Sequence, residues 1–114
     1  MNITENIEVH NTLNPKIFRG DIMRQDVRDA ALQIVNHFLQ QIDMKVNVSD
    51  VVLLGSNAAY NYTEDSDFDL HIITNFNRYD ANPEIIKELF NARRSNWKNN
   101  YDVTIKGYPV EIYV

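Results

Sequence analysis

The first regular feature of the chain is a helical spacing of apolar residues that begins at Asp26. From there to Met44, apolar residues recur at steps of three and four, as on one face of an amphipathic helix: Val27, Ala31, Ile34, Phe38 and Ile42. We therefore predict a helix over 26–44. The preceding residues, up to about Phe18, show no clear period and are rich in Asn and Thr, which predicts an irregular or docking segment.

Two later segments have the patterns of strands. The apolar run Val51–Leu54 follows Ser49-Asp50 and stops at Gly55, and its length and β-branched start favour a buried strand. Between Asp67 and Thr74 the residues alternate instead. Phe68, Leu70 and Ile72 fall on one face, and Asp67, Asp69 and His71 fall on the other. This second strand has one apolar face and one polar face. Residues 57–62 between the strands suit a short helical turn, followed by a polar loop over 63–66.

The last third of the chain predicts one more helix and a hairpin. Asn82-Pro83 is a helix cap followed by proline at the first helical position, and the helix extends to about Lys98. Two strands joined by a turn at Gly107 follow, over 101–106 and 108–114. The predicted fold is α+β or α/β, with a small mixed β-sheet flanked by helices. We predict an irregular N-terminal segment over 1–25 and one domain over 26–114.

Composition narrows the classes of function. The chain has 114 residues, 44% hydrophobic and 24% charged, as in an ordinary single-domain globular protein. Its N-terminus does not resemble a secretory signal, and no apolar run reaches the roughly 20 residues of a membrane span. The absence of cysteine favours a cytoplasmic setting. A net charge of −5 disfavours binding to long duplex DNA but allows a nucleotide held by a metal ion and local cations.

The candidate chemistry lies between the two predicted strands. Gly55 lets the backbone approach a ligand closely, and the free N–H groups of the following turn, with the Ser56 hydroxyl, form a candidate phosphate site. Asp67 and Asp69 stand on one face of a strand, with Cα atoms about 6.6 Å apart. Two such carboxylates can converge on divalent ions, and hard oxygen ligands favour Mg²⁺ or Mn²⁺.

At these residues the chain resembles the DNA polymerase β-like nucleotidyltransferase superfamily. The shared signature is a strand ending in Gly-Ser, a helical turn, and a second strand that opens Asp-x-Asp, here Gly55-Ser56 and Asp67-Phe68-Asp69. The ten-residue spacing between them is similar to that of minimal nucleotidyltransferases. The chain also looks like nucleotidyltransferases encoded by bacteriophages, through Leu13–Lys16, Asp69–Ile72 and Lys106–Glu111.

The resemblance implies a nucleotidyltransferase fold and a role for each matching residue. Asp67 and Asp69 would be metal ligands, and Gly55 and Ser56 would contact the phosphates of an NTP, most simply ATP. Members carry a third carboxylate on a later strand, and here it matches Glu111, the only charged residue from Tyr108 onward. Glu111 would bind metal and activate the attacking hydroxyl. The residues after Ser56 depart from the Arg or Gly of many members, and unless the chain is a fragment, we expect it to lack the C-terminal helical domain of larger members.

Structural explanations compete with these roles. The two aspartates could line a solvated strand face, Glu111 could be a surface residue of an edge strand, and His71 suits a structural histidine. Arg93, Arg94 and Lys87 fit solvated helix charges better than phosphate ligands. Tyr60 and Tyr62 could line the nucleotide pocket or simply pack, and Trp97, Phe90 and Leu89 suit the core.

Three hypotheses for function follow. The first is an Mg²⁺-dependent enzyme that moves a nucleoside monophosphate from an NTP to an acceptor hydroxyl and releases pyrophosphate. Its acceptor could be a small molecule, a protein or an RNA end. The second is an antitoxin-like protein that nucleotidylates or masks a partner protein. The third is a non-catalytic nucleotide-binding module of the same fold.

Overall fold

The computed structural model describes residues 9–42, 45–75, 79 and 81–114. The helices are α1 (Gln25–Gln41) and α2 (Pro83–Asn100), with a short 3₁₀ turn, η2 (Ser56–Ala58). The strands are β1 (Phe18–Arg19), β2 (Ile22–Met23), β3 (Asp50–Leu54), β4 (Phe68–Ile73), β5 (Thr104–Ile105) and β6 (Tyr108–Tyr113). None of the helices in this part of the chain has the length and apolar content to cross a membrane.

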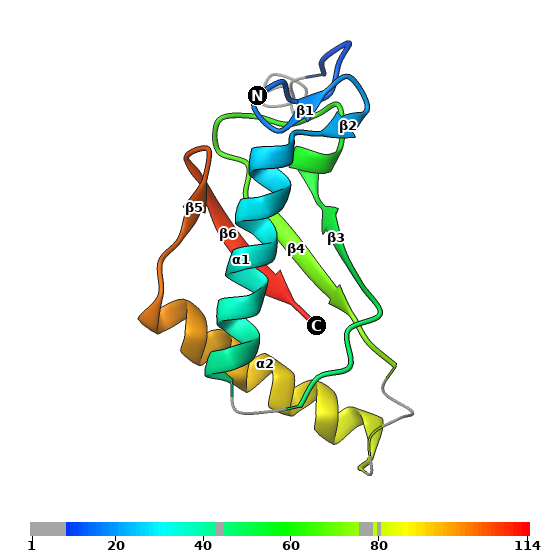
Figure 1. The fold of residues 1–114 in the computed structure, drawn as a ribbon, viewed down its shortest axis with the longest axis vertical. Helices are drawn as coiled ribbons and strands as arrows, with labels where there is room; N and C mark the ends of the chain where they lie inside the picture. The colour runs from blue at the N-terminus through cyan, green and yellow to red at the C-terminus, as the bar shows by residue number, and fades with distance from the viewer. Residues whose placement is uncertain (1–8, 43–44, 76–78, 80) are drawn as a thin grey trace, which may run out of the picture.

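The main sheet is mixed and has the strand order β3-β4-β6-β5. The central pair, β4 and β6, is parallel, while β3 pairs antiparallel with β4 and β5 pairs antiparallel with β6. Figure 1 shows α1 running along this sheet and α2 crossing near its lower end. The α+β prediction, with a mixed sheet and helices, is therefore confirmed.

One hydrophobic core holds the two helices against a single face of the sheet. It contains the alternate residues of β4 and β6, together with the buried faces of α1 and α2. In β4 the even-numbered residues are buried, and Asp69 and His71 are half-buried, as the alternation predicts. In β6 the same holds, with Glu111 and Tyr113 on the less buried face. The second face of the sheet, which we call the polar face, therefore carries the candidate chemistry.

The described part of the N-terminal segment, residues 9–25, has more structure than the sequence predicts. Strands β1 and β2 form a small antiparallel hairpin just before α1. Upstream of it, Asn14 is 1% exposed and donates through Nδ2 to Asn57 Oδ1 (3.0 Å) and to the Tyr108 hydroxyl (2.9 Å). Asn14 therefore ties this segment to the turn after β3 and to the start of β6. The predicted domain boundary between residues 25 and 26 stays a prediction.

Several element predictions need correction. Helix α1 ends at Gln41, and the predicted continuation to Asp43 and Met44 lies outside the described residues. Its buried face includes Val35, while Ile34 is half-buried. β3 is not a buried strand: it lies at the edge of the sheet, its middle residues are half-buried and Leu54 is 46% exposed. An apolar run alone does not distinguish a central strand from an edge strand.

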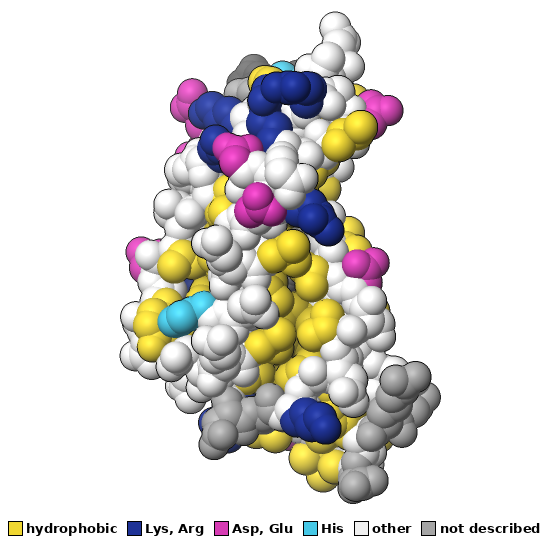
Figure 2. All heavy atoms as spheres, viewed as in Figure 1, with side chains coloured by type: hydrophobic (Ala, Val, Ile, Leu, Met, Phe, Trp, Pro, Cys, Tyr) yellow, Lys and Arg dark blue, Asp and Glu magenta, His cyan; other side chains and the backbone are white. Residues whose placement is uncertain are grey.

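An apolar groove of about 380 Å³ runs between α1 and the edge strand β3. Its lining includes Leu32 of α1 and Val51 and Leu53 of β3. Figure 2 shows the apolar side chains gathered in this hollow on the helix-covered side of the molecule. The groove is on the opposite side of the sheet from the polar face and holds none of the predicted site residues.

Candidate functional site

The parallel pairing of β4 and β6 places two of the predicted site residues side by side. Asp69 is the register partner of Glu111, so both side chains project from the polar face at adjacent positions on neighbouring strands. On the other side of Asp69 the register partner is Leu54, the residue just before Gly55. Residues that are distant in sequence thus meet in one row across β3, β4 and β6.

Gly55 makes room for the Asp69 carboxylate. Its backbone has φ +79°, and a Cβ built there would overlap Asp69 Oδ2 and lie 3.3 Å from Asp69 Cγ. Any other residue would be strained in this conformation and would also displace the carboxylate. The close neighbour of Gly55 is thus the Asp69 carboxylate, and the predicted approach of this backbone to a ligand stays a prediction.

Hydrogen bonds fix the loop that follows Gly55. The Ser56 and Ser66 hydroxyls are 2.6 Å apart, and Ser66 Oγ also accepts from the Thr63 amide (2.8 Å). The buried Asn57 donates through Nδ2 to the Asp67 carbonyl (2.9 Å). These hydrogen bonds thus fix both ends of the ten-residue connection between the Gly-Ser pair and Asp67.

The predicted helix start after Gly55 is only the three-residue η2 turn. Because so few peptide dipoles align in it, the helix-dipole part of the predicted phosphate site is small. Any phosphate contact at Gly55 and Ser56 would rest on backbone N–H groups and the serine hydroxyl.

Like charges and burial shape the electrostatics around Asp69. Burial and the neighbouring Asp67 raise the pKa of the Asp69 carboxyl; His71 opposes this and Glu111 adds to it. Burial also raises the pKa of Tyr113, with further contributions from Asp69 and Glu111. The polar face therefore concentrates negative charge that is not fully neutralised.

Glu111 has a cationic neighbour that the sequence does not indicate. Lys98 Nζ of α2 lies 3.6 Å from Glu111 Oε1 and donates to the Val110 carbonyl (3.2 Å). Lys98 belongs to α2 and Glu111 to β6, and no periodic pattern links them. The four-residue spacing from Arg94 to Lys98 was the one available signal, because it places both cations on the same side of α2.

A second row of side chains lies beside the first. The His71 and Tyr113 rings are stacked with centroids 4.7 Å apart, and Arg94 Cζ lies 4.7 Å from the centroid of Tyr113. This stacking gives His71 a packing role. Arg94 Nε is buried without a hydrogen-bond partner among the described residues. Phe90 and Trp97 belong to the core, as the sequence predicts, but the same prediction is wrong for Leu89, which is 37% exposed.

The site residues fit a divalent cation in chemistry but do not form a closed cluster. Their oxygen ligands suit Mg²⁺, and a cation would offset the burial and the repulsion from Asp67 that together raise the pKa of Asp69. Among the described residues, however, no three His, Asp or Glu side chains are grouped closely enough to hold a metal ion. Asp67 is exposed, and the ammonium of Lys98 stands beside Glu111. The three-carboxylate metal site therefore stays a prediction.

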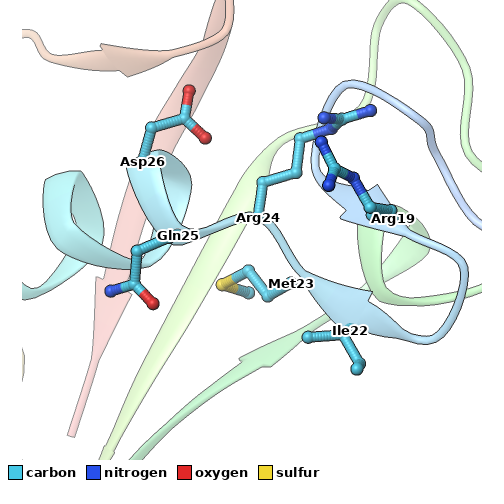
Figure 3. A pocket seen from close by; sticks show the side chains of 6 residues that line it. All are labelled: Arg19, Ile22, Met23, Arg24, Gln25 and Asp26. Atoms are coloured by element: carbon cyan, nitrogen blue, oxygen red, sulfur yellow. The ribbon is translucent and has the colours of Figure 1, made fainter.

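A cavity of about 450 Å³ lies elsewhere, between the β1–β2 hairpin and the start of α1. Figure 3 shows its six lining side chains, with those of Arg19 and Arg24 close together on one side. It contains neither Gly55 nor the carboxylates of the polar face. This cavity and the candidate chemistry therefore lie in different places, and we place the candidate site where the carboxylates and Gly55 meet.

The chain matches the family model of the nucleotidyltransferase domain over residues 33–114, which is more than half of its length. It therefore belongs to the nucleotidyltransferase domain family, a family of transferase enzymes within the polymerase β-like superfamily. Membership implies NTP-dependent nucleotidyl transfer, and proteins of this superfamily typically use a divalent metal. A search of curated proteins and a search of solved structures each found no match. The likeness to phage-encoded proteins has no support from these comparisons.

Proposed function

We propose that the protein transfers a nucleoside monophosphate from an NTP, most simply ATP, to an acceptor hydroxyl on the polar face of the sheet. The observation that carries this proposal is the parallel register that places Asp69 beside Glu111. The Asp69 carboxylate also occupies the space that a side chain at Gly55 would take. The family match supports the reaction class independently of this geometry.

The carboxylates have separate tasks in this proposal. Asp67, Asp69 and Glu111 would hold Mg²⁺, which when bound supplies charge stabilisation to the triphosphate and the attacking oxygen. Gly55 and Ser56 would position the phosphates through backbone N–H groups and the serine hydroxyl. The triphosphate would lie toward β3, and the acceptor would lie toward β6.

The bond changes follow from this placement. The acceptor oxygen bonds to the α-phosphorus, the bond from that phosphorus to the bridging oxygen breaks, and pyrophosphate leaves with the electron pair. The Glu111 carboxylate takes the hydroxyl proton as general base. A base on the β6 side and a phosphate loop on the β3 side allow attack from the side opposite the leaving group.

The test is transfer of label from α-labelled NTPs to an acceptor panel of small molecules, proteins and RNA ends in the presence of Mg²⁺. We expect Asp67→Asn and Asp69→Asn each to lower transfer by roughly 100-fold, as when a group that stabilises developing charge is removed. Asp65→Asn is the matched control, because Asp65 is an exposed aspartate of the adjacent loop. Equal transfer by all variants would refute the roles given to Asp67 and Asp69.

The same assay separates the alternatives. Labelling of one co-purifying protein, with no small-molecule product, would identify the antitoxin-like function. Binding of a non-hydrolysable NTP without any need for Mg²⁺, together with no turnover, would identify a non-catalytic module.

A further inference from the structure

The ammonium of Lys98 lies next to the Glu111 carboxylate, where it can affect whether Glu111 binds a cation. Its side chain is 29% exposed, and that of Glu111 is 25% exposed, so water screens the pair only in part. The hydrogen bond from Nζ to the Val110 carbonyl anchors the ammonium against β6. Lys98 is therefore held beside Glu111 by two contacts.

The ammonium and a divalent cation compete for the same carboxylate. A cation bound at Glu111 would stand close to the positive charge of Lys98, and the two would repel. The arrangement seen in the structure is thus suited to a cation-free state.

Lys98 has a second carboxylate within reach. Asp102 Oδ1 lies 3.7 Å from Nζ, almost the same distance as Glu111 Oε1 at 3.6 Å. Asp102 follows Lys98 by four residues, and its side chain is 88% exposed. A small movement of the lysine side chain would therefore exchange Glu111 for Asp102 without leaving the ammonium unpaired.

We propose that Lys98 is a positioning residue that holds Glu111 in the cation-free protein and passes to Asp102 when a divalent cation binds. This rests on the proposed function, because it takes Glu111 as a cation ligand. It makes loading of the cation at Glu111 conditional on displacement of Lys98. A nucleotide that brings the cation with it would supply that displacement.

Binding of Mn²⁺ by the full chain, measured by electron paramagnetic resonance without nucleotide or acceptor, tests the proposal. We expect Lys98→Met to bind Mn²⁺ roughly fivefold more tightly, the effect of removing an ion pair of about 1 kcal/mol. Asp102→Asn should bind Mn²⁺ more weakly. Without the Asp102 carboxylate, Lys98 can no longer pass from Glu111 to Asp102 when the cation binds. The two substitutions thus have opposite expected signs.

Matched controls come from another lysine–aspartate pair, Lys106 Nζ to Asp26 Oδ2 at 2.7 Å, which joins the β5–β6 turn to α1. Lys106→Met and Asp26→Asn make the same changes of charge away from Glu111, so they should leave Mn²⁺ affinity unchanged. If either control reproduces the effect of its counterpart, the general charge of the protein explains the result and the proposal is overturned.

A double-mutant cycle with Glu111→Gln shows whether Lys98 acts through Glu111. In the Glu111→Gln background, Lys98→Met should no longer change Mn²⁺ affinity. Weaker binding by Lys98→Met alone would overturn the proposal in favour of a lysine that orients the carboxylate for the cation. Mn²⁺ binding that is equal in the wild type and Lys98→Met overturns this inference but not the proposed function. No Mn²⁺ binding by any variant, even with NTP, overturns both.

Discussion

The backbone conformation of Gly55 and the position of the Asp69 carboxylate, a candidate metal ligand, depend on each other. The residue has φ +79°, and the carboxylate of Asp69 occupies the space where a side chain would be. Substitution by alanine should therefore have two costs. One is backbone strain of about 1 kcal/mol or more, and the other is displacement of Asp69. We expect Gly55→Ala to lower both the free energy of unfolding and nucleotidyl transfer, measured by urea denaturation and by the labelling assay.

Gly107→Ala is the matched control for this prediction. Gly107 has a similar φ of +85°, but nothing lies within 4 Å of the position of an added Cβ. It should show the cost of strain alone and keep transfer activity. Loss of activity in Gly107→Ala equal to that in Gly55→Ala would show that the contact with Asp69 is not responsible.

Asp69 should destabilise the folded protein at neutral pH. Its pKa is raised in the folded state by burial and by Asp67, so the folded protein binds this proton more readily than the unfolded chain does. Ionisation of Asp69 therefore costs stability. The cost is absent below the ordinary pKa of 3.8 and is fully present above the raised pKa.

It follows that Asp69→Asn should be more stable than the wild type at neutral pH, by at most about 1 kcal/mol because the group is half-exposed. Urea unfolding in chelator-containing buffer, from neutral pH to below 3.8, measures the difference. The gain should shrink as pH falls and vanish once both states are protonated. A variant that is less stable than the wild type at neutral pH would contradict this account. The opposite effects of Asp69→Asn on stability and activity are typical of a functional residue.

At the scale of elements, the sequence predicted the features of strands and helices that local interactions determine. The alternation around Phe68 and Leu70 gave the two faces of β4, and Asn82-Pro83 marked the start of α2, where the Asn82 side chain accepts from the Glu84 amide (2.8 Å). These features depend on residues close in sequence. The edge position of β3 was not predictable in this way, because it depends on which strands pair.

The candidate site was predictable for the same reason, but only in part. The spacing from Gly55 to Asp67 and the face occupied by Glu111 could be read from sequence. Lys98 could not, because its approach to Glu111 depends on how α2 crosses beside β6. Asn14 was also missed, since an Asn-rich segment without a period gives no sign that one of its side chains is buried.

At the scale of the whole molecule, the described part of the N-terminal segment, residues 9–25, belongs to the folded structure around the site. Asn14 bonds to Asn57 and Tyr108, and Asn57 in turn donates to the carbonyl of Asp67. A chain of hydrogen bonds thus connects residues outside the matched family domain to the start of β4. These groups are buried, so each must keep a partner to avoid a desolvation cost.

We therefore expect Asn14→Leu to lower the free energy of unfolding by about 3 kcal/mol. The substitution removes the donor to Asn57 Oδ1 and to the Tyr108 hydroxyl, and each buried polar group left without a partner costs about 1–3 kcal/mol. It also removes the acceptor of the Lys16 amide, which Asn14 Oδ1 binds at 3.1 Å. Asn11→Leu is the matched control, because Asn11 is an exposed residue of the same segment and should change stability by less than about 0.5 kcal/mol.

Coupling to Asn57 distinguishes an integrated segment from an appended one. If Asn14 and Asn57 act through their shared hydrogen bond, Asn14→Ala and Asn57→Ala should cost together clearly less than the sum of their separate effects, since either one already breaks the bond. Additive effects, or an Asn14→Leu protein as stable as Asn11→Leu, would mean that residues before the helix contribute little to the fold. Asn57 also donates to the Asp67 carbonyl. If the two substitutions are coupled, the hydrogen bond from Asn14 therefore helps to determine the position of Asp67.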